Sequence, residues 1–168
     1  SECSTPGEGG FQLPEGEEGD PVSEARSIVT VCGPCFRSGV WPGKHGVMDN
    51  SFKGMSLENH PTVFDRLSFE RESVATACIA QWGPIHERFG GAATWSVDAE
   101  DQEDVARRAV EVLEKHDPDL IFLHFDGADG AGHGSGYSAD NPAYLEAIER
   151  ADRGLGLVLD AIAARPRA

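Results

Sequence analysis

The stretch DQEDVARRAVEVLEKHDPDLIFLHF, Asp101–Phe125, decides the fold class. Its first part carries apolar residues at helical spacing, with acids at the start and Lys115-His116 at the end, where the charges complement the helix dipole. Asp117-Pro118 ends this helix, because the residue before a proline disfavours the helical conformation. The run LIFLHF, Leu120–Phe125, then has the unbroken apolar character of a buried strand. A helix that leads directly into a buried strand indicates an α/β fold.

The same alternation of helix and strand extends to both sides of this stretch. SVATACIAQW, Ser73–Trp82, is small and apolar throughout and predicts a strand covered on both faces. A helix over Pro61–Phe69, capped by Asn59, precedes it, and a last helix is predicted over Asn141–Ala164. The apolar face of this last helix is formed by Ala147, Ile148, Ala151, Leu155 and Leu159. We therefore expect a mostly parallel central sheet with helices on both faces, with ligands bound beyond the carboxyl ends of the strands.

Composition divides the chain into two parts and limits its partners. Residues 1–24 contain few aliphatic side chains and predict a disordered, acidic and Gly-rich leader before an α/β domain over residues 25–168. The 168 residues include 14 Lys and Arg against 29 Asp and Glu, which gives a formal net charge of −15. Such a surface repels polyanions, so binding of duplex nucleic acid is not expected. No apolar run approaches the roughly 20 residues of a membrane span, and the compartment is left open.

Two cysteines follow a short predicted strand near the start of this domain. The β-branched run SIVTV, Ser27–Val31, leads into Cys32-Gly33-Pro34-Cys35. This is the Cys-Gly-Pro-Cys sequence of a thioredoxin active site, in which the start of a helix lowers the pKa of the first thiol. A thioredoxin-like disulfide oxidoreductase acting through Cys32 and Cys35 is therefore one hypothesis. The alternative is a tight turn that contains two small residues.

A Gly-rich segment, HFDGADGAGHGSGY (His124–Tyr137), follows the predicted strand that ends at Phe125. Here Asp129 and His133 are separated by Gly130, Ala131 and Gly132, and the glycines permit tight backbone turns in a loop. A carboxylate and an imidazole that converge in this way suit Zn²⁺ or Mn²⁺. The alternative is a Gly-rich turn with an incidental exposed histidine.

Two motifs in order resemble one known family. GVWPGKHGVMDNSF, Gly39–Phe52, lies in a predicted long loop over residues 39–54, and the His124–Tyr137 segment follows it with Tyr144 and Asp152 on the next helix. Together they resemble the type I phosphodiesterase/nucleotide pyrophosphatase family of the alkaline phosphatase superfamily. The resemblance implies an alkaline phosphatase-like core that hydrolyses small-molecule phosphate esters with two zinc ions. It further implies that Asp129 and His133 are metal ligands and that Asn50 binds the substrate phosphate.

The chain departs from this family at the nucleophile. Cys32 stands where the family has Thr or Ser, and a thiolate binds zinc well but is a poor nucleophile towards phosphorus. The metal ligands that the family carries before and after this region have no counterpart in the sequence. We therefore expect an incomplete or diverged copy with at most one Zn²⁺ and impaired hydrolysis. A non-catalytic remnant or binding module of the same fold is the alternative.

Overall fold

The computed structural model describes residues 38–71 and 73–165. The predicted leader over residues 1–24, the predicted strand Ser27–Val31 and both Cys32 and Cys35 lie outside the described residues. The elements in chain order are α2 (Pro42–His45), α3 (Val63–Glu70), β1 (Thr76–Ala80), α4 (Gly83–Phe89), β2 (Trp95–Asp98), α5 (Gln102–His116), β3 (Leu120–His124), α6 (Gly127–Ser135) and α7 (Pro142–Ala164).

The three strands form a parallel sheet in the order β2-β1-β3. In the central strand β1, Ile79 aligns with Val97 of β2 on one side and with Leu123 of β3 on the other. Every residue of β1 is buried, as the small apolar sequence of this segment predicts for a strand covered on both faces. The α/β prediction from the sequence is thus confirmed.

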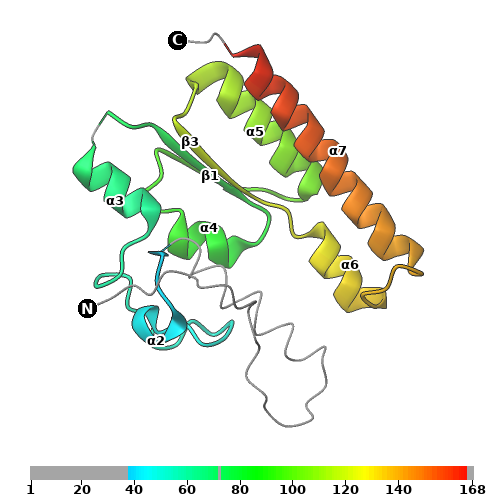
Figure 1. Ribbon diagram of the computed structural model, residues 1–168, viewed down its shortest axis with the longest axis horizontal. Coiled ribbons are helices and arrows are strands. Elements are labelled where there is room, and N and C mark those ends of the chain that lie inside the picture. The colour runs from blue at the N-terminus through cyan, green and yellow to red at the C-terminus, as the bar shows by residue number, and fades with distance from the viewer. Residues whose placement is uncertain (1–37, 72, 166–168) are drawn as a thin grey trace, which may run out of the picture.

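Helices cover both faces of the sheet (Figure 1). Helix α5 lies against β1 and β3 on one face, and α7 packs along α5. Helix α4 lies against β1 and β2 on the other face, where Figure 1 also shows α3. None of the helices in the described part of the chain combines the length and the apolar character that crossing a bilayer requires.

The main core lies between the sheet and the pair α5 and α7. Its buried side chains come from β1, the turn after β2, α5 and α7, and they are Ala77, Ile79, Ala99, Val105, Ala106, Ala109, Val112, Leu113 and Val158. A smaller cluster on the other side joins the loop after α2 to α4 through Val47, Phe52 and Phe89. This second cluster fixes the loop that carries Asn50 against the rest of the domain.

The boundaries of α3, α5 and α7 agree closely with the three predicted helices, with one correction at a cap. Helix α5 is capped by Asp101 and α7 by Asn141, each through a side chain that accepts a backbone N–H. The cap of α3 is Thr62 instead of Asn59. Thr62 and Asp65 form a reciprocal capping box, which satisfies two backbone N–H groups at once.

Helix α4 and strand β2 do not figure among the sequence predictions. Both are short, and α4 begins with Gly83-Pro84, a pair that in sequence also suits a turn. Strand β2 is only partly buried because it lies at the edge of the described sheet. Its pairing with β1 is therefore a tertiary effect that local sequence does not reveal.

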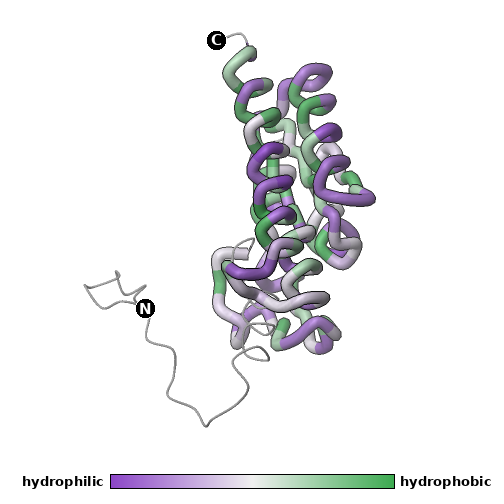
Figure 2. Tube along the Cα trace, turned by 90° about the vertical axis from the view of Figure 1, so that its right-hand side faces the viewer, coloured by the Kyte–Doolittle hydropathy of each residue, from purple (hydrophilic) through white to green (hydrophobic). Residues whose placement is uncertain are grey.

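The buried face of α7 differs from the predicted one. Ala147, Gly154 and Val158 are buried, whereas Ile148, Leu155 and Leu159 are 41%, 43% and 54% exposed. The small residues face α5, and a Cβ on Gly154 would lie 3.1 Å from the Cβ of Ala106. Close approach of the two helices thus selects small side chains over large ones. Figure 2 shows hydrophobic and hydrophilic segments alternating along α7, the helix that ends near the C-terminus.

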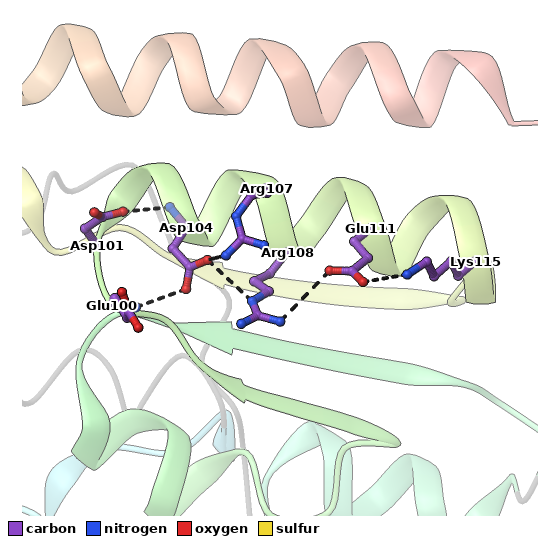
Figure 3. A network of polar contacts seen from close by, with 7 residues as sticks. All are labelled: Glu100, Asp101, Asp104, Arg107, Arg108, Glu111 and Lys115. Atoms are coloured by element: carbon purple, nitrogen blue, oxygen red, sulfur yellow. Dashed lines mark hydrogen bonds and ion pairs between the residues drawn. The ribbon is translucent and has the colours of Figure 1, made fainter.

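Charged side chains form polar contacts along α5 (Figure 3). Asp104 accepts from the backbone N–H of Glu100 and pairs with both Arg107 and Arg108. Further along the helix, the Lys115 ammonium lies 2.6 Å from Glu111 and, through hydrogen bonding, lowers the pKa of that carboxyl. These pairs at helical spacing stabilise α5 modestly.

Candidate metal centre

The candidate site lies just beyond the carboxyl end of β3. The three parallel strands end at the same edge of the sheet, which is where ligands bind in folds of this class. His124 is the last residue of β3, and α6 begins three residues later at Gly127. The residues that the sequence singled out, Asp129 and His133, therefore lie on the first helix beyond this edge.

The Gly-rich segment forms helix α6, so the predicted loop over these residues is wrong. Glycine costs about 1 kcal/mol in a helix relative to alanine, which is why the sequence favours a loop. The helix forms nonetheless because it packs against α7. Cβ atoms on Gly130 or Gly134 would meet nothing, whereas one on Gly132 would overlap the ring of Tyr137. Only Gly132 of these three is required by close packing.

The helical geometry brings Asp129 and His133 together. They stand four residues apart on one face of α6, with Asp129 Oδ2 3.2 Å from His133 Nε2. Two ligand atoms of a tetrahedral zinc ion, each about 2.0–2.1 Å from the metal, lie about 3.3–3.4 Å from one another. The two side chains are 34% and 29% exposed, so an ion can reach them. The separation of Asp129 Oδ2 and His133 Nε2 is thus close to that of two ligand atoms on one cation.

A second carboxylate and imidazole lie beside this pair. Asp126 Oδ1 is 3.9 Å from His124 Nε2 at the end of β3. Burial raises the pKa of the Asp126 carboxyl above its usual range; His124 and His133 oppose this rise, and the Asp129 carboxylate adds to it. The charge of Asp126 is therefore coupled to both members of the first pair.

Tyr137 is a contact of the site that the sequence reasoning missed. Its hydroxyl donates to Asp129 Oδ1 at 2.7 Å, and its ring meets the imidazole of His133 edge-on, with the centroids 5.3 Å apart. Sequence spacing gives no signal for this contact, because α6 ends at Ser135 and Tyr137 lies in the turn after Gly136, whose φ is positive. The contact depends on the path of the backbone beyond the end of the helix.

The other predicted site residues are Asn50 and Cys32. Asn50 is exposed in the turns that follow α2. Cys32, the predicted nucleophile position, lies outside the described residues, as does Cys35. The roles of Asn50 and Cys32 and the thioredoxin-like hypothesis therefore stay predictions.

A pocket of about 320 Å³ opens at the same edge of the sheet, on the other side of α6. Gly127 and Ala131 line it, and each is offset by two residues, about 200° around the helix, from Asp129 or His133. The remaining lining residues are Gln81, Asp101, Gln102, Glu103, Ala143, Glu146, Ala147 and Arg150. The pocket is thus separate from the Asp129–His133 pair.

Asp129 and His133 are suitable ligands for a divalent cation, but they are fewer than a complete site needs. Carboxylate oxygen and imidazole nitrogen are ordinary zinc ligands, and a structural site uses four of them. Within residues 38–71 and 73–165, no three His, Cys, Asp or Glu side chains gather closely enough to hold an ion. Asp129 and His133 therefore supply two positions of a centre, and water, substrate or other protein groups must supply the rest.

Comparison with known proteins points to the same region. Residues 90–167, which include β2, α5, β3, α6 and α7, match the sequence profile of the Metalloenzyme superfamily. The chain is also 49% identical over 57 residues to 2,3-bisphosphoglycerate-independent phosphoglycerate mutase from Pyrococcus horikoshii. That match covers 33% of this chain and 12% of the mutase.

Two solved structures of phosphonoacetate hydrolase from Sinorhizobium meliloti 1021 share the fold. The complex with phosphonoacetate has a TM-score of 0.59 at 14% identity, and the complex with phosphonoformate has 0.60 at 15% identity. Each comparison covers 81% of this chain and 43% of the hydrolase, so the chain spans less than half the length of these structural relatives. Residues 90–167 thus carry the sequence pattern of the metalloenzyme superfamily, on the alkaline phosphatase-like α/β fold that the sequence predicts.

Proposed function

We propose that this chain contributes Asp129 and His133 to the metal centre of a metal-dependent hydrolase of phosphate or phosphonate esters. The observation that carries the proposal is the 3.2 Å separation of Asp129 Oδ2 and His133 Nε2 on one face of α6, beyond the carboxyl end of β3. The match of residues 90–167 to the metalloenzyme superfamily supports it. Zn²⁺ is the ion that we propose, because carboxylate and imidazole are both among its usual ligands.

The residues have distinct proposed tasks. Asp129 and His133 bind the cation, and Tyr137 keeps one carboxylate oxygen of Asp129 hydrogen-bonded. The bound cation supplies Lewis-acid polarisation of a phosphoryl oxygen. Asn50 donates its side-chain amide to the same phosphoryl group, as the sequence resemblance implies. Cys32 occupies the nucleophile position, and its thiol makes turnover slow.

The substrate class that we propose is a small phosphate ester, with a phosphodiester of the nucleotide pyrophosphatase kind as the first choice. The sequence resemblance in residues 39–52 and 124–137 supports this choice. The relatives named above act on or bind phosphoglycerates, phosphonoacetate and phosphonoformate by their names, and all of these are small phosphorus-containing anions. The feature that these compounds share is a phosphoryl or phosphonyl group.

Hydrolysis of bis(p-nitrophenyl) phosphate with added Zn²⁺ tests the proposal. We expect slow release of p-nitrophenol that EDTA abolishes and that Asp129→Ala removes, because the ion loses a ligand. Asp160→Ala is the matched control, since Asp160 is an exposed carboxylate on α7, and it retains the activity. Hydrolysis that persists in both EDTA and the Asp129→Ala variant contradicts the proposal.

A metal-binding module without turnover is the second candidate. The small number of metal-binding side chains favours it, because in the described part of the chain only Asp129 and His133 converge at α6. This candidate predicts one bound Zn²⁺ per chain and no hydrolysis. The hydrolase predicts turnover that depends on the bound ion, so measured zinc stoichiometry and the hydrolysis assay together separate the two.

A further inference from the structure

The two oxygens of the Asp129 carboxylate have different partners. Oδ2 faces His133 Nε2 at 3.2 Å, whereas Oδ1 accepts the hydroxyl of Tyr137 at 2.7 Å. The same hydroxyl lies 3.2 Å from the Asp129 backbone oxygen. A tyrosine hydroxyl has one proton, and a carboxylate is the stronger acceptor at the shorter distance. The hydrogen bond to Oδ1 therefore fixes the rotation of the carboxylate about its own axis.

The Tyr137 ring is held in place on several sides. It meets the His133 imidazole edge-on and the Tyr144 ring at 5.5 Å between centroids. Gly132 lies beneath it with no room for a Cβ. The backbone that carries the ring is tied as well, because the Asn141 side-chain amide donates to the backbone oxygen of Gly136 at 2.5 Å. The ring thus has a defined position relative to both proposed ligands.

We propose that Tyr137 is a positioning residue of the metal centre, which holds Asp129 so that its Oδ2 and His133 Nε2 meet one cation. This inference rests on the proposed function. A ligand whose second oxygen is hydrogen-bonded is already oriented before the ion arrives, so less conformational freedom is lost on binding. Tyr137 acts through Asp129 and does not itself touch the ion.

The test compares variants of the full chain by titration with Zn²⁺ in a calorimeter. Tyr137→Phe keeps the ring and deletes the hydroxyl, and we expect it to weaken Zn²⁺ binding about 10- to 100-fold, the usual effect of losing a partner of a ligand. Ser138→Ala is the matched control, because it deletes a hydroxyl from the neighbouring residue that bonds Asp140 instead. It is expected to bind Zn²⁺ as the unaltered chain does.

A spectroscopic measurement separates positioning from general stability. Co²⁺ in place of Zn²⁺ reports ligand geometry through its visible absorption bands. We expect these bands to change in Tyr137→Phe while the melting temperature of the metal-free chain stays within a few degrees. Gly132→Ala provides a second route to the same effect, because its Cβ displaces the Tyr137 ring. We expect it also to weaken Zn²⁺ binding.

The outcomes distinguish this inference from the proposed function. If Tyr137→Phe binds Zn²⁺ as tightly as the unaltered chain while Asp129→Asn binds weakly, the role of Tyr137 is overturned and the metal centre stands. If the unaltered chain binds no Zn²⁺, or Asp129→Asn binds it as well as the unaltered chain, both are overturned.

Discussion

Replacing His133 by Ala is expected to lower the affinity for Zn²⁺ by more than the roughly 100-fold that loss of an outer partner costs, because a ligand itself is removed. Its Nε2 lies 3.2 Å from Asp129 Oδ2, and without it the described residues leave one donor at this position. Competition with a fluorescent zinc chelator measures the change. Hydrolysis that depends on the ion is expected to fall in parallel.

His116→Ala is the matched control for this prediction. His116 ends α5 next to the amino end of β3, and its ring stacks on Trp95 with the centroids 4.6 Å apart. It lies at the opposite edge of the sheet from α6, so its loss leaves the zinc affinity unchanged. Equal losses of affinity in the two variants would mean that zinc binds to surface histidines without regard to α6.

Replacing Ile79 by Ala is expected to destabilise the domain by about 2–5 kcal/mol, the range observed for truncation of a buried aliphatic side chain. Ile79 is fully buried in the central strand and aligns with Val97 and Leu123. A domain of this size is stable by only about 5–15 kcal/mol in total, so the change is a large fraction of it. Urea unfolding followed by circular dichroism measures the difference.

Leu157→Ala controls for the loss of apolar volume. Leu157 lies on α7 and is 59% exposed, so its truncation leaves no cavity and changes the stability by about 0.5 kcal/mol or less. An Ile79→Ala variant as stable as Leu157→Ala would show that β1 is not the centre of the core. The parallel sheet described above would then be wrong.

The parts of the fold that the sequence predicted are those with strong local patterns. Helix α5 begins and ends at the residues that its caps and charges indicate, and the apolar run after Pro118 forms β3. Strand β1 is recognisable because all of its residues are small or apolar. In each case the local preference and the tertiary environment agree.

The parts that the sequence did not predict depend on contacts between distant segments. Helix α6 contains glycines that disfavour a helix, and its packing against α7 overrides that preference. The buried face of α7 is set by the close approach of Gly154 to Ala106. A prediction from hydrophobicity alone instead buries the larger leucines of α7, which are exposed in the structure. Strand β2 forms because β1 offers an edge for pairing.

The ligand roles of Asp129 and His133 stay predictions, but the structure brings the two side chains together, and it adds a contact with Tyr137 that the sequence did not indicate. The spacing of Asp129 and His133, together with the resemblance of residues 39–52 and 124–137 to a metal-dependent family, led to the proposal of a cation site. The contact of Tyr137 with both depends on the helix and on the turn after Gly136, which has a positive φ of 101°. Such a contact becomes visible only when the backbone path is known.

The most direct test of the central claim is an anomalous difference map, recorded at the zinc absorption edge, from crystals of this chain soaked in Zn²⁺. The account predicts a peak about 2.0–2.2 Å from both Asp129 Oδ2 and His133 Nε2. Zinc peaks only at other side chains, with Asp129 and His133 still paired to one another, would contradict it.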